Sequence, residues 1–180
     1  MLAIVLGWPL AGLAADNQTG AESVKTPVKA AIVDVRKIPD WQGEAVGNVE
    51  VTYADGSRDR WTTLATAQQP RVAADGVVGW VDCSKEEAGK KQMDIYKGVP
   101  VGSRLVLCAS GKVTARINAG KPFIEQWGFA PDGQHVIVKS RAAHGPALIE
   151  RFSRADGKPN GSVAGFAEDA PDWAKAYLDK

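Results

Sequence analysis

The sequence predicts an all-β protein built from two to three antiparallel meanders, followed by a short C-terminal helix. Three observations predict this fold class. A four-strand unit occurs twice, in residues 70–117 and again in residues 125–163. Both copies contain tight Asp-Gly or Ser-Gly turns, and apolar residues alternate with polar ones between these turns. Repetition of a supersecondary unit at a regular spacing is typical of folds in which each unit packs on the next.

The two copies align turn for turn. The segment PRVAADGVVGWVDCS matches WGFAPDGQHVIVKS, so residues 75–76 fall on residues 132–133. The segment RLVLCASGKVTARI matches ALIERFSRADGKPNGSV, so residues 110–111 fall on residues 156–157. We expect type I′ hairpins at these positions, because both central residues of such a turn have positive φ and glycine adopts positive φ without strain.

An incomplete third copy precedes the two full ones. In VEVTYADGSRDRW, Asp55-Gly56 closes a hairpin whose first strand alternates apolar and polar residues. The spacing of about fifty residues is in the range of propeller blades, so we expect small sheets packed face against face. Two to three blades cannot close an ordinary propeller ring. The sequence therefore predicts an open, propeller-blade-like arrangement with exposed strand edges.

The C-terminal segment EDAPDWAKAYL predicts the short helix. Asp169 is a candidate N-cap, Pro171 stands at the start, and Trp173 and Tyr177 follow one turn apart. We expect this aromatic face to cover an open edge or end of a sheet.

The N-terminal residues 1–14 predict a secretory signal peptide, because an uncharged apolar run is followed by small residues. No Lys or Arg precedes that run, so we expect the true start to lie upstream of the recorded one. Residues 15–29 are polar and predict a flexible leader, with the first strand at Ala30. Residues 30–180 then form a single domain of an exported, periplasmic protein without a membrane span.

Charge and cysteine content narrow the function classes. The formal net charge is +1 and basic residues are interleaved with acidic ones, which argues against a nucleic-acid surface. Cys83 and Cys108 are the two cysteines, and an oxidising compartment favours a disulfide between them. Two buried thiols are the alternative, because a simple hairpin would place these residues at opposite ends.

Catalytic and metal-binding signatures are missing from the sequence. It contains no Gly-x-Ser-x-Gly, His-Glu-x-x-His or paired Cys-x-x-Cys motif, so we expect neither an enzyme nor a cofactor or metal site. His135 follows a turn within a strand and is expected on a solvated face. Residues 82–97 form the longest irregular segment, which is either a solvated excursion or a specificity loop that presents Met93 and Tyr96 to a partner.

Two resemblances refine this interpretation. The segments PRVAADGVVGWVD and WGFAPDGQHVIVKS resemble the propeller repeats of TolB-type periplasmic proteins, which implies strand topology and little else. With the segments AIVDVRKIPDWQG, KPFIEQWGF and SRAAHGPALIERF, most of the mature chain resembles the periplasmic immunity proteins that neutralise peptidoglycan-amidase effectors of type VI secretion.

The second resemblance implies a mechanism of inhibition. A rigid β scaffold would insert a turn into the cleft of a secreted cysteine amidase, and residues 109–112 are the candidate plug. The candidate plug consists of Ala109, Ser110, Gly111 and Lys112. The Ser110 hydroxyl could bond the enzyme's Cys and His, Lys112 could meet an acidic rim, and the turns at Asp55 and Asp156 could flank the plug. We expect a monomer or a small homo-oligomer. The competing hypothesis is an accessory envelope module that binds a periplasmic protein or glycan without inhibiting it.

Overall fold

The computed structural model describes residues 25–179, and the fold is all-β, as predicted. The predicted signal peptide, residues 1–14, lies outside the described residues. Strand β1 begins at Pro27, three residues before the first strand predicted at Ala30, so the end of the predicted leader belongs to the domain. No helix among residues 25–179 is long and apolar enough to cross a membrane.

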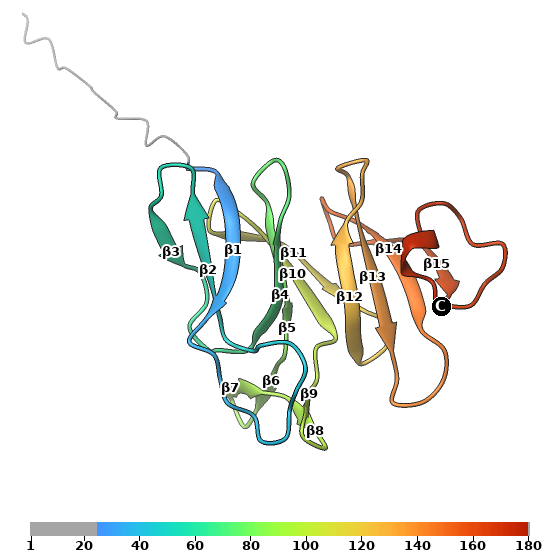
Figure 1. Cartoon of the computed structure of the whole chain (residues 1–180), viewed down its shortest axis with the longest axis horizontal. Helices are drawn as coiled ribbons and strands as arrows, with labels where there is room; N and C mark the ends of the chain where they lie inside the picture. The colour runs from blue at the N-terminus through green and yellow to red at the C-terminus, as the bar shows by residue number, and fades with distance from the viewer. Residues whose placement is uncertain (1–24, 180) are drawn as a thin grey trace, which may run out of the picture.

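Three antiparallel sheets stack side by side, and Figure 1 shows their faces turned toward one another. Sheet 1 has the order β1-β2-β3, sheet 2 the order β11-β10-β5-β4, and sheet 3 the order β12-β13-β14-β15. Sheets 2 and 3 are the two predicted full meanders, and sheet 1 is the incomplete one. The strands of sheet 1 are β1 (Pro27–Val33), β2 (Asn48–Tyr53) and β3 (Arg58–Arg60). Those of sheet 2 are β4 (Ala67–Val72), β5 (Val78–Asp82), β10 (Arg104–Ala109) and β11 (Lys112–Asn118). Those of sheet 3 are β12 (Phe123–Phe129), β13 (His135–Arg141), β14 (Leu148–Ser153) and β15 (Pro159–Ala164).

Sheet 2 is buried on both faces, and β5 shows how its sequence achieves this. Val78 and Trp80 pack into the core shared with sheet 1, whereas Val81 packs into the core shared with sheet 3. At Gly79 a Cβ atom would lie 2.5 Å from the Trp127 ring. Glycine at this position therefore lets the largest fully buried side chain lie directly against the strand.

The predicted disulfide is absent, because Cys83 and Cys108 are both free thiols. Cys108 pairs with Val78 in the ladder between β10 and β5, and Cys83 lies five residues further along the chain. Because a strand rises about 3.3 Å per residue, this offset separates the two cysteines along the strand direction. The two side chains also enter different cores, on opposite faces of sheet 2. A disulfide requires a Cα–Cα distance below about 7 Å, and this register excludes it. Burial raises the pKa of the Cys83 thiol to about 12 and that of Cys108 to about 11.

The predicted C-terminal helix is reduced to one 3-10 turn, η1 (Lys175–Tyr177). The tail nevertheless covers the sheet, since Ala170 and Ala174 are buried against Ile137 and Ile149 on the outer face of sheet 3. It covers a face rather than an edge. A single turn suffices because this contact comes from tertiary packing and not from intrinsic helix stability.

The four Asp-Gly turns are not of type I′. Positive φ is confined to their glycines, with values of 66° to 81°, and each aspartate carboxylate accepts the backbone N–H two residues later. This geometry is that of a longer hairpin loop whose left-handed residue is glycine. Ser110-Gly111 does have the predicted type I′ pattern, with φ of 49° and 73°.

Residues 83–103, which we call the insertion, join β5 to β10 and form two small hairpins instead of an irregular loop. One hairpin contains β6 (Ser84–Glu87) and β7 (Lys90–Met93), and the other contains β8 (Ile95–Tyr96) and β9 (Val99–Pro100). Met93 is buried, whereas half of Tyr96 is exposed. Of the two residues predicted to reach a partner, the structure leaves Tyr96 available.

Candidate functional site

The candidate site is the end of the stack where hairpin turns of all three sheets lie, which we call the turn end. Figure 1 shows the β2–β3, β4–β5 and β12–β13 turns at its upper edge. The turn between β14 and β15 reaches the same region, because Arg154 Nη2 lies 2.8 Å from the Asp75 carboxylate in the β4–β5 turn. The predicted plug is the β10–β11 turn.

The Ser110-Gly111 turn is narrow and open to solvent. Ala109 and Lys112 face each other across the last pair of the β10–β11 ladder, so the turn contains two residues. Ser110, Gly111 and Lys112 are exposed, and a Cβ atom added at Gly111 would meet nothing within 4 Å. The turn therefore has the size and freedom that entry into another protein's cleft requires.

The base of this hairpin is held by both cores. Leu107 is completely buried between sheets 2 and 3, and Cys108, the next residue, is buried between sheets 1 and 2. A register shift separates the pairings of these two residues, and the Thr114 hydroxyl donates a hydrogen bond to the Leu107 carbonyl (3.3 Å). A hairpin fixed on both faces loses little conformational entropy when it binds.

The two predicted flanking acids are each satisfied within their own turn. Asp55 accepts hydrogen bonds from Ser57 and pairs with Lys25, whose Nζ lies 2.9 Å away, and these contacts hold the pKa of its carboxyl well below the usual range. Lys158, 3.0 Å away, lowers the pKa of Asp156 to about 2. Both side chains are exposed and ionised at neutral pH. Within the described residues 25–179, neither Asp55 nor Asp156 forms a hydrogen bond with Ser110.

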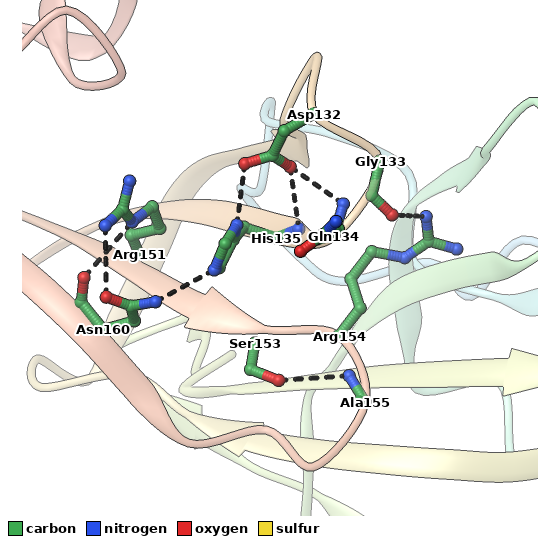
Figure 2. A network of polar contacts seen from close by, with 9 residues as sticks. All are labelled: Asp132, Gly133, Gln134, His135, Arg151, Ser153, Arg154, Ala155 and Asn160. Atoms are coloured by element: carbon green, nitrogen blue, oxygen red, sulfur yellow. Dashed lines mark hydrogen bonds and ion pairs between the residues drawn. The ribbon is translucent and has the colours of Figure 1, made fainter.

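A polar network occupies the neighbouring part of the turn end, and sequence reasoning missed it (Figure 2). His135 Nδ1 lies 2.7 Å from the Asp132 carboxylate, and its Nε2 lies 2.9 Å from the Asn160 amide nitrogen. The tautomer with its proton on Nδ1 satisfies both contacts. Hydrogen bonds from the Gln134 backbone and from this histidine lower the pKa of Asp132. Only 17% of the His135 side chain is exposed, less than expected for a solvated face.

Asn160 extends the network to the C-terminal tail. Arg151 donates hydrogen bonds to the Asn160 backbone carbonyl (3.2 Å) and side-chain oxygen (3.1 Å), and its guanidinium lies 5.2 Å from the Trp173 ring centroid. Both ring nitrogens of His135 are therefore engaged by other side chains of this network. These contacts link the β12–β13 turn, strands β13, β14 and β15, and the C-terminal tail.

Arg154 connects the two full meanders. Its guanidinium contacts both Asp75 oxygens, donates to the Gly133 carbonyl and lies 5.0 Å from the Phe129 ring centroid. A hollow of about 550 Å³ opens beside it, lined mainly by the β12–β13 and β14–β15 turns. No group of three or more His, Cys, Asp or Glu side chains suited to a metal ion occurs within the described part of the chain.

Comparisons with known proteins add no functional assignment. No protein-family model matches the chain, and no curated protein matches it. A chain in a structure titled "Crystal Structure of Mitotic Checkpoint Complex" is similar at 15% sequence identity, with a TM-score of 0.29; the match covers 91% of this chain and 60% of that one. A similarity at this level carries no argument about fold or function.

Proposed function

We propose that this protein is an exported immunity protein that inhibits a secreted, peptidoglycan-cleaving cysteine amidase. Inhibition would occur in the periplasm through insertion of the Ser110-Gly111 turn into the active-site cleft. One observation carries this proposal: the turn is exposed at its tip, while the residues at its base are buried in two separate cores. A two-residue tip on a fixed base suits cleft entry better than a mobile loop, because less order must be imposed on binding.

The side chains of the turn supply the polar contacts for such a complex. The Ser110 hydroxyl can donate one hydrogen bond and accept others, so it can bond a thiolate and an imidazole together. Lys112 is exposed and carries a positive charge toward an acidic cleft rim. Asp55 and Asp156, ionised and exposed, would contact the periphery, where charges mainly affect association rate and selectivity.

The decisive experiment tests rescue and inhibition together. Bacteria that export the amidase to the periplasm lyse, and co-export of this protein should prevent lysis; purified protein should inhibit hydrolysis of peptidoglycan fragments. Failure in both assays at saturating concentration would exclude the immunity function.

A matched pair of variants locates the contact. The Ala88-Gly89 turn of the β6–β7 hairpin has φ values of 51° and 74°, nearly those of Ser110-Gly111, and is also exposed. Ser110→Trp should weaken inhibition at least about a hundredfold, on the scale of a central interface residue, whereas Ala88→Trp should leave inhibition unchanged. Both variants should retain the thermal stability of the wild type. Equal inhibition by the two variants would mean that the amidase contacts a part of this protein other than residues 109–112.

A further inference from the structure

The insertion is larger than sheet 2 needs. The equivalent connection in sheet 3, between β13 and β14, takes residues 142–147, whereas sheet 2 uses residues 83–103 and builds two extra hairpins. Both connections join neighbouring strands of the same meander. In Figure 1 the insertion projects from the end of the stack opposite the turn end. An ordered excursion beyond what the connection requires is characteristic of functional loops.

The β8–β9 hairpin exposes apolar side chains on a tightly held turn. Ile95 is 45% exposed and Tyr96 is 50% exposed. Lys97 and Gly98 have φ values of 49° and 80°, so this turn is of type I′, like the plug. The cost of leaving these side chains in water is offset if they contact a ligand.

A groove of about 480 Å³ lies beside this hairpin, between the insertion and sheet 3. The rings of Tyr96 and Phe123 line it, with centroids 6.5 Å apart and planes inclined at 52°. This volume lies within the range of about 300–1,000 Å³ typical of small-ligand sites.

The polar lining of the groove is a balanced pair of charges. Lys85 Nζ lies 3.6 Å from Asp94 Oδ1, beyond ordinary hydrogen-bond distance, and both side chains line the groove. Their side chains are 43% and 31% exposed. The ammonium therefore retains donor capacity and the carboxylate retains acceptor capacity, even though Glu87 also approaches Lys85 at 3.3 Å.

We propose that this groove binds an oligosaccharide. A sugar ring has an apolar C–H face that can stack on Tyr96 or Phe123 and hydroxyl groups that both donate and accept hydrogen bonds, as Asp94 and Lys85 require. Glu87, beside Lys85, and Lys97, whose Nζ lies 5.4 Å from the Tyr96 ring centroid, add one charge of each sign to those of Asp94 and Lys85. The charges around the groove therefore balance, which favours an uncharged polar ligand over an acidic or basic peptide. The site is independent of the Ser110 turn and of any amidase.

The test is a titration of the ¹⁵N-labelled full chain with chitotetraose and, separately, with cellotetraose. Backbone amide signals of residues 94–101 and 122–124 should shift with at least one sugar, while signals of residues 109–112 stay in place. Tyr96→Ala should weaken the affinity on the order of tenfold. Phe166→Ala is the matched control, because Phe166 is 67% exposed and lies outside the groove, and its affinity should equal that of the wild type.

Asp94→Asn provides a second test that retains the shape of the groove. It removes a charged acceptor and should weaken sugar binding severalfold with little change in melting temperature. The proposal is overturned if neither sugar shifts residues 94–101 at 10 mM, or if Tyr96→Ala binds as well as Phe166→Ala. It is also overturned if these signals respond to a purified amidase and to no sugar, since the groove would then be a protein-binding surface.

Discussion

Sheets 2 and 3 contain the same four-strand meander and differ in their connections. Sheet 2 has the insertion between its second and third strands and a type I′ turn in its last hairpin, whereas sheet 3 has residues 142–147 and a longer Asp-Gly turn at these places. The strands are alike because they bury alternate residues in a shared core. The Ser110-Gly111 hairpin belongs to sheet 2, and the β8–β9 hairpin lies in the connection between two strands of that sheet. One copy therefore carries the candidate recognition elements, while the other packs against it and is covered by the tail.

The largest expected effect comes from removing the side chain that both copies share. Trp127 is 1% exposed, packs against Gly79 and donates a hydrogen bond to the Gln69 carbonyl (3.0 Å). Trp127→Ala should lower the free energy of unfolding by about 3–5 kcal/mol. Urea denaturation should show one cooperative transition in the wild type and in the variant, because neither copy has a complete core without the other. Two separate transitions would mean that the copies fold independently.

The pH dependence of stability reports on the copy that contains sheet 2, because Cys108 lies in β10 and Cys83 directly follows β5. In the unfolded chain a thiol ionises near 9, whereas burial raises the pKa of Cys83 to about 12 and of Cys108 to about 11. Between these values the folded state binds more protons than the unfolded state, so stability falls as pH rises, by at most ~1.4 kcal/mol per pH unit for each thiol. Below pH 9 the free energies of unfolding of the wild type and of the double variant Cys83→Ala/Cys108→Ala should differ by a constant amount. Above pH 9 the free energy of unfolding of the wild type should fall relative to that of the variant. A constant difference up to pH 11 would contradict the burial of the thiols.

The smallest expected effect concerns the ion pair that joins the copies at the turn end. Arg154 is 11% exposed in its side chain but Asp75 is 59% exposed, so solvent screens the pair. A double-mutant cycle with Arg154→Ala and Asp75→Ala should give a coupling free energy of about 0.2–1 kcal/mol. This coupling should decrease in 1 M NaCl. A coupling that salt leaves unchanged would show that packing on Phe129, rather than charge, holds the arginine.

Much of the fold could be predicted from local sequence. Glycine marks each tight turn because it alone adopts positive φ freely, and the apolar alternation of Val49, Val51 and Tyr53 marks the strand before the first of them. The two copies could be aligned because these signals recur in the same order. The turn type was wrong for the Asp-Gly pairs, since an aspartate carboxylate that bonds the chain two residues later stabilises a longer loop.

The remaining errors depend on tertiary arrangement. The disulfide was predicted from composition and compartment, but the ladder register of β5 and β10 places the two thiols apart. The tail has helix-capping residues, yet packing on sheet 3 determines its conformation. In the candidate site, the Ser110 turn could be found from a Ser-Gly pair between apolar strands. The Asp75–Arg154 contact joins residues 79 positions apart and depends on how the sheets stack, so no local signal reveals it.

The two outer faces of the stack differ from the faces that the sheets turn toward one another. On sheet 1 the outward positions alternate with buried ones and hold Glu50 and Thr52, and Glu50 lies 3.4 Å from Arg58. On sheet 3 the tail already occupies the apolar face. A further sheet packed on either face would therefore bury a charged side chain on sheet 1 or displace the tail from sheet 3. The twenty-one-residue excursion 83–103 instead extends a connection between two strands of sheet 2, where neither core has to open to admit it.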